Sequence, residues 1–78
     1  MEKEQYQEFL LNEPEKPLTE REFEVLKGVV LGKSNTKIAE ELFISVHTAK
    51  AHVCSILHKM SVDDRVQAAV KAVREGIL

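Results

Sequence analysis

The residues best suited to chemistry lie close together between positions 44 and 62, in the stretch ISVHTAKAHVCSILHKMSV. This stretch holds all three histidines of the chain, its only cysteine and two lysines, and it contains none of the thirteen acidic residues. Imidazole, thiol and ammonium groups in one short segment suit metal binding, thiol redox chemistry or contact with an anionic polymer. The spacing of these residues decides between the three.

Metal binding and catalysis are not favoured by that spacing. Cys54 and His58 are four residues apart and His47 precedes them by two turns, so one helix face would carry all three. Three ligands on one short helix cannot surround a metal ion tetrahedrally, so such a site would need a partner chain. The histidines also lack a cleft and a matched nucleophile. We therefore expect no bound metal, no other cofactor and no enzymatic activity.

Contact with DNA fits the segment better. Plotted at 100° per residue, its outer face carries polar or small residues, namely His47, Lys50, Ala51, Cys54, Ser55 and His58. A carboxylate on this face would repel phosphates, whereas small residues let the helix approach a duplex and Lys50 can donate to guanine. The lack of acids therefore favours DNA binding. The plainer alternative is the solvated polar face of any amphipathic helix.

Cys54 leaves a second interpretation open. Oxidation of its thiol, or a disulfide between two chains, would block the face that meets DNA. The alternative is an inert small side chain, because an isolated cysteine often has no role beyond packing. Comparing DNA affinity with and without reductant distinguishes a redox switch at Cys54 from an inert thiol.

The helix that carries this face must be positioned by others, and the first of these has a complete start signal. Thr19 can cap it while Glu22 reaches back in a capping box, and Leu18 with Phe23 occupies the two positions of a hydrophobic staple. Gly32 is placed to end this helix in a left-handed conformation. The sequence therefore predicts a first helix that is capped by Thr19 and ended by Gly32.

Cap signals for three further helices follow, at Ser34 or Asn35, at Ser45, and at Asp63 or Asp64. Phe43 lies in the turn before the third helix, and a bulky side chain disfavours positive φ, so we expect that turn not to be left-handed. The fourth helix is expected to carry one apolar face, made of Val66, Ala69, Val70 and Val73. Because no segment alternates with period two, the predicted fold class is all-α, with four helices.

A short helix, a tight turn and a longer helix form a helix-turn-helix, a motif whose second helix can enter the major groove of DNA. The pieces LTERE, GKSNTKIAEEL, FIS, HTAKAHV and DDRVQAAV occur in one order without a gap. In these pieces the run 18–78 resembles the LuxR-type helix-turn-helix domain of NarL/FixJ response regulators and GerE-like stand-alone regulators. The resemblance implies a transcriptional regulator that binds double-stranded DNA as a homodimer.

The resemblance also implies residue roles. With the outer face of the helix, it gives candidate base contacts at Lys50, Ala51, Cys54, Ser55 and His47. Candidate phosphate contacts are Thr48, Lys37, Lys33, His52 and His58, which would hold register without reading sequence. The fourth helix is expected to supply the dimer surface through Val66, Ala69, Val70, Ala72 and Val73.

Composition sets the remaining expectations. A chain of 78 residues has room for one small domain. Neither a signal-like apolar start nor a run long enough to span a bilayer is present, so a cytoplasmic protein without membrane contact is expected. Residues 1–17 hold five acids against two lysines, so they are predicted to form an acidic, loosely ordered arm before a domain at 18–78.

The sequence thus predicts a DNA-binding transcriptional regulator that reads a near-palindromic site with its third helix, about residues 46–60. The competing hypothesis is an interaction module of the same fold that modulates another regulator or RNA polymerase without touching DNA. The acidic arm and the few cations on the third helix favour that alternative. A DNA affinity that falls steeply with salt would exclude it.

Overall fold

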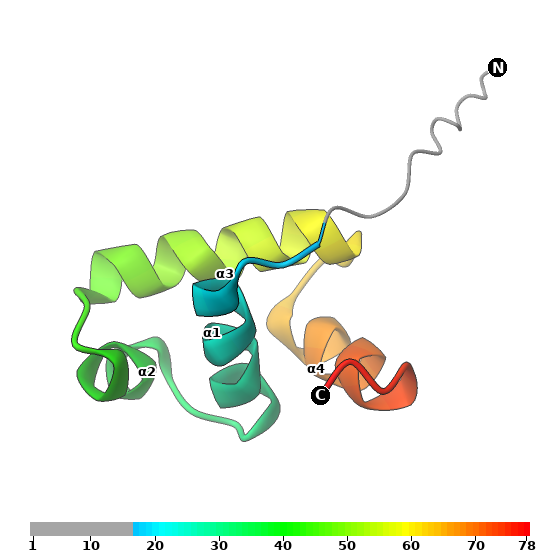
Figure 1. Ribbon diagram of the computed structural model, residues 1–78, viewed down its shortest axis with the longest axis horizontal. Coiled ribbons are helices and arrows are strands. Elements are labelled where there is room, and N and C mark those ends of the chain that lie inside the picture. The colour runs from blue at the N-terminus through cyan, green and yellow to red at the C-terminus, as the bar shows by residue number, and fades with distance from the viewer. Residues whose placement is uncertain (1–16) are drawn as a thin grey trace, which may run out of the picture.

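The computed structural model describes residues 17–78 and confirms the all-α class. Its four helices are α1 (Glu20–Val30), α2 (Asn35–Leu42), α3 (Val46–Met60) and α4 (Arg65–Arg74), and this part of the chain contains no strand. The other three helices lie on one side of the long α3 (Figure 1). α1 packs against both α3 and α4, and α2 packs against α3. The expected arm at 1–17 lies outside the described residues except for Pro17.

Every helix begins at a side-chain cap, as the sequence predicts. Thr19 Oγ1 accepts from the backbone N–H of Glu22, and Glu22 Oε1 accepts from the N–H of Thr19, which completes the capping box. The two alternatives left open are settled by the structure: Ser34 caps α2 and Asp64 caps α4. Each cap satisfies an amide that would otherwise lack a partner at a helix start.

The helix ends are left-handed at more positions than expected. Gly32 follows α1 with φ +78°, as predicted. Phe43, however, has φ 58° and ψ 43°, so the expectation that this turn avoids the left-handed region was wrong. Its side chain is 94% exposed and meets little, while the following amide, that of Ile44, donates to Ala39 O at 3.0 Å. That bond satisfies an orphan carbonyl of α2 and offsets the backbone strain.

The core forms where the four helices meet, and one glycine is explained by it. A Cβ on Gly28 would lie 2.7 Å from Cγ1 of Ile38, so only glycine lets α2 approach α1 this closely. The fully or nearly buried apolar residues are Val25, Leu26, Val29, Ile38, Ala39, Ala49, Val53, Ile56, Met60, Ala68 and Ala72. Over residues 17–78, no helix combines the length and hydrophobicity that a bilayer span requires.

The apolar face predicted for the fourth helix is not the face that the core covers. Ala68 and Ala72 are the buried residues of α4, at 1% and 0% exposure, whereas Val66 and Val73 are 68% and 66% exposed. Alanines four residues apart lie on one helix face and let α4 approach its neighbours closely. The valines consequently point to solvent.

Candidate nucleic-acid interface

The helix-turn-helix is formed by α2, the three residues 43–45 and α3. Ser45 caps α3, with its hydroxyl accepting from the Thr48 amide at 2.9 Å and donating to the Thr48 hydroxyl at 2.9 Å. Ala49, Val53, Ile56 and Met60 fix the opposite side of α3 to the core. The buried stripe therefore determines which residues of α3 face outward.

The outer face of α3 is exposed and carries no carboxylate. Its exposed members are His47, Lys50, Ala51, Cys54 and His58, and the Cys54 thiol is free. No residue of α3 is acidic. The structure therefore brings five of the six residues expected on this face together, on the side of α3 opposite its buried stripe.

Ser55 is the sixth residue, and it departs from the expectation. Its hydroxyl donates to Oε2 of Glu22 at 2.7 Å, so it faces α1 and is only half-exposed. Lys59 donates to Oε1 of the same carboxylate, also at 2.7 Å. Because this flank of α3 is tied to α1, Ser55 is withdrawn from the candidate base contacts.

Glu22 is the residue whose full role sequence reasoning missed. Burial by itself raises the pKa of its carboxyl, but hydrogen bonds from Lys59, Ser55 and the Thr19 amide outweigh burial and lower the pKa to about 2. The side chain is thus a buried, fully ionised anchor between α1 and α3. The capping box predicted its bond to Thr19, but no local pattern signals partners 33 and 37 residues away.

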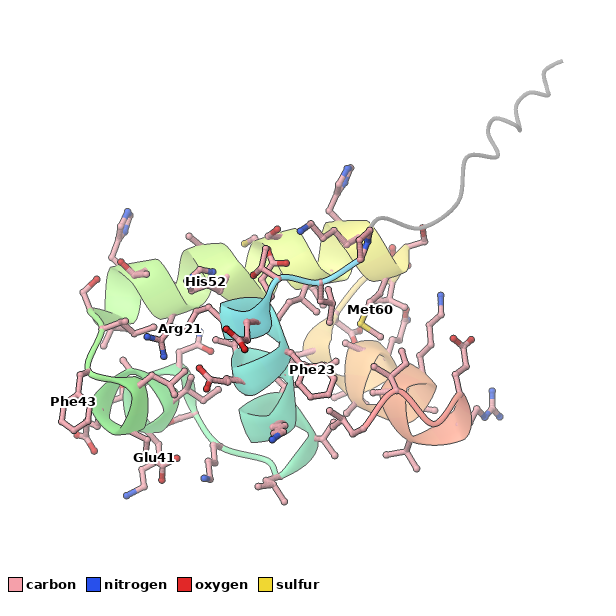
Figure 2. The ribbon with its side chains drawn as sticks, viewed as in Figure 1. Arg21, Phe23, Glu41, Phe43, His52 and Met60 are labelled. Atoms are coloured by element: carbon pink, nitrogen blue, oxygen red, sulfur yellow. The ribbon has the colours of Figure 1, made fainter. Side chains whose placement is uncertain are left out.

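Both lysines expected to bind phosphate have a carboxylate partner. Lys33 Nζ lies 2.6 Å from Oε1 of Glu41, and Lys37 Nζ lies 3.9 Å from its Oε2. The hydrogen bond from Lys33 lowers the pKa of Glu41 below its usual value. Both pairs are solvent-accessible, so their rearrangement costs little. His52 is half-buried on the flank of α3 (Figure 2), while His58 is exposed.

The candidate dimer residues on α4 divide into two groups. Val66, Val70 and Val73 are 68%, 48% and 66% exposed, and Ala69 is half-buried. Ala72 is fully buried inside the monomer, so it is not available to a second chain and that assignment was wrong. Across residues 17–78, no three histidine, cysteine or acidic side chains gather as a metal site would require.

The sequence of this four-helix region is similar to that of known proteins. The family model of bacterial regulatory proteins of the luxR family matches residues 16–72, which covers most of the chain and all of α1 to α3. The chain belongs to this family. Its helix-turn-helix is therefore the luxR-type unit of α2 and α3, within a four-helix domain.

Individual members of the luxR family are similar in sequence to this chain. The chain is 48% identical over 65 residues to the transcriptional regulatory protein LiaR of Bacillus subtilis (strain 168), covering 83% of this chain and 31% of LiaR. It is 43% identical over 61 residues to the response regulator protein VraR of Staphylococcus aureus (strain NCTC 8325 / PS 47), covering 78% and 29% of the two chains. The chain therefore spans about a third of the length of these relatives.

A solved structure agrees in fold. The response regulator ChrA, from a heme-sensing two-component system, superimposes with a TM-score of 0.77 at 36% identity, over 86% of this chain and 33% of ChrA. The four-helix fold is thus shared with about a third of the ChrA chain. Heme sensing is a property of the ChrA system.

Proposed function

We propose that this luxR-family chain is a transcriptional regulator that binds specific double-stranded DNA with α3 in the major groove. The observation that carries the proposal is the outer face of α3, which is exposed, free of carboxylates and fixed by a buried stripe on the opposite side. Small side chains at Ala51 and Cys54 let the helix backbone approach base edges. His47 and Lys50 flank them with hydrogen-bond donors.

Residues around this face would hold the helix in register. Thr48 lies in the first turn of α3, and the N-terminal end of a helix favours phosphate oxygens. His58, His52, Lys37 and Lys33 add donors, and the two lysines would exchange Glu41 for phosphate at little cost because these ion pairs are exposed. Contacts of this kind strengthen binding without reading sequence.

Lys50→Ala tests the base contact, with Lys27→Ala as a charge-matched control on α1. Bound sequences are first selected from a random DNA pool, and affinity for the preferred site is then measured by fluorescence anisotropy. Loss of Lys50 should cost about 1–3 kcal/mol and relax base preference at one position, whereas loss of Lys27 should change neither. The log of affinity should fall with log salt, with a slope of roughly −0.9 per phosphate neutralised. Equal affinity for all sequences would refute specific recognition.

Dimerisation through α4 is the second part of the proposal. Val66, Val70 and Val73 form an exposed apolar stripe, and Ala69 lies half-buried between them and the core. Two copies on half-sites one helical turn apart would double the phosphate contacts and read a near-palindrome. Sedimentation with and without a palindromic duplex tests this, and a complex with one chain per duplex would contradict it.

A regulator that binds the bacterial chromosome would act in the cytoplasm. The alternative function is an interaction module for another regulator or RNA polymerase. It is favoured by one observation, namely that Lys59 is held by Glu22 and leaves Lys50 as the exposed lysine of α3. Failure of the random-pool selection, with the domain folded, would support this alternative.

A further inference from the structure

The valine stripe of α4 lines a groove. Val66, Val70 and Val73 recur at i, i+4 and i+7, so they lie on one side of the helix. Val66 and Val70 border an open groove of about 370 Å³, whose other lining residues are Gln67, Lys71, Arg74 and Glu75. Moving such side chains out of water is favourable by roughly 25 cal/mol per Å² of apolar surface. Covering the stripe with an apolar segment is therefore favourable.

The charge around the valine stripe indicates which kind of segment could bind there. α4 contains Arg65, Lys71 and Arg74 and no acidic residue, and the charged residues that line the groove are two basic ones, Lys71 and Arg74, and one acidic one, Glu75. Arg65 donates to the side chain of Asn35 and to the carbonyl of Lys33, both of which are neutral acceptors. A segment that suits this helix is consequently apolar at its centre and acidic around it.

Residues 1–16 of this chain, MEKEQYQEFLLNEPEK, have that composition. Tyr6, Phe9, Leu10 and Leu11 form one apolar cluster within six positions, and five glutamates stand against two lysines. The net charge of this segment is −3, which is opposite in sign to the net charge of the groove lining. The outer face of α3 is a poorer match, because its polar and small side chains offer the apolar cluster little to pack against.

The point of attachment brings this segment close to α4. The carbonyl of Pro17 accepts from Lys59 Nζ at 3.4 Å, at the end of α3. The next residue, Met60, accepts through its carbonyl from Lys71 Nζ of α4 at 2.7 Å. Sixteen residues can span up to roughly 50 Å, whereas the ten residues of α4 are about 15 Å long. Residues 1–16 are therefore long enough to reach the whole valine stripe.

We propose that residues 1–16 dock on the valine stripe of α4, with the apolar cluster over Val66, Val70 and Val73 and the glutamates beside Lys71 and Arg74. A short tether gives an effective concentration in the millimolar range, so weak packing is sufficient. The regulatory consequence rests on the proposed function: the docked segment and a second copy compete for one face, and docking lowers dimerisation and hence affinity for a palindromic site.

Tyr6 reports on docking directly, because the chain has no other tyrosine and no tryptophan. Acrylamide quenching of its fluorescence is measured on the full chain at a concentration where sedimentation shows monomers. We expect several-fold slower quenching than in a peptide of residues 1–16, and Val70→Lys should restore the peptide value. Leu31→Lys is the matched control, since Leu31 is an exposed apolar residue at the end of α1, and it should leave quenching unchanged.

Each other result overturns the docking proposal. Quenching equal to the peptide's means that the segment does not dock, and protection that survives Val70→Lys and Val73→Lys places it elsewhere. Protection that grows with protein concentration assigns the stripe to another chain. Circular dichroism confirms that each variant is folded.

The regulatory consequence is measured separately, by sedimentation and DNA titration of the Phe9→Ser/Leu10→Ser variant. Stronger dimerisation and tighter binding to the palindrome are expected. Docking without this gain would refute the competition, and absence of DNA binding in every variant would refute the proposed function while leaving the Tyr6 result intact.

Discussion

Replacing Glu22 by Gln should destabilise the domain by about 3 kcal/mol at neutral pH. The carboxylate is 5% exposed and accepts from Lys59, Ser55 and the Thr19 amide, and its pKa is lowered from 4.5 to about 2. A shift of this size corresponds to about 3 kcal/mol, at about 1.4 kcal/mol per pKa unit. Removing the charge also leaves the ammonium of Lys59 without its anion in a largely buried position. A loss of this size is a large fraction of a small domain's stability.

The same carboxylate predicts how stability depends on pH. Because the pKa of Glu22 is lower in the folded chain than in the unfolded chain, the unfolded state binds a proton first as pH falls. The contribution is fully present above about pH 5 and is lost progressively as the pH falls from there towards 2. Urea unfolding followed by circular dichroism at several pH values measures this loss. In Glu22→Gln the free energy of unfolding should vary much less over that range.

Lys59→Met supplies the matched control for this reasoning. It removes the cation but keeps a long apolar stem, so the pKa of Glu22 should rise and the stability loss on acidification should begin at a higher pH. The double variant then gives the coupling energy of the pair. If wild type and Glu22→Gln lose stability in parallel between pH 5 and 2, Glu22 is not the anchor described here.

Three further changes are predicted from the packing. Gly28→Ala should destabilise by about 1 kcal/mol, because crowding against Ile38 costs more than alanine's helix propensity gains; Ile38→Val should partly rescue it in thermal unfolding. Phe43→Gly should raise stability by up to about 1 kcal/mol by relieving the left-handed strain, and unfolding in urea checks the sign. Arg65→Ala should cost about 1–3 kcal/mol, because it removes the bonds to Asn35 and the loop carbonyl; amide exchange should rise in residues 33–35.

Local chemistry made the fold predictable from the sequence. The cap at Thr19 and the left-handed conformation of Gly32 each depend only on residues within a few positions of themselves. The structure confirms both. The orientation of α4 was predicted less well, because a valine stripe and an alanine pair compete for the core on hydrophobicity alone. Close helix approach selects the small residues Ala68 and Ala72, and that geometry depends on the partners of α4.

The candidate interface likewise contains residues that local patterns predict and residues that only contacts distant in sequence explain. The exposed residues Lys50, Ala51 and Cys54 follow from helical periodicity, since the buried stripe is strong. Ser55 was misjudged because a hydroxyl on the flank of a helix suits water, DNA or another helix equally well. What holds it is the Glu22 carboxylate, which lies 33 residues away in sequence and meets it only after folding. Phe43 was misjudged because the hydrogen bonds that compensate its strain are equally invisible in the sequence.

The way Glu22 is neutralised constrains how the domain can bind DNA. An acid so close to α3 would oppose DNA phosphates, but Lys59 and Ser55 bind it internally and keep its charge away from the outer face. The cost is that Lys59 is committed to the fold, which leaves Lys50 as the exposed lysine of that helix. Since each phosphate neutralised adds to affinity, one copy should bind weakly, and the proposed pairing through α4 should raise the affinity for DNA. Under this proposal, a segment or second chain that covers the valine stripe of α4 would change DNA binding by α3 without contacting α3.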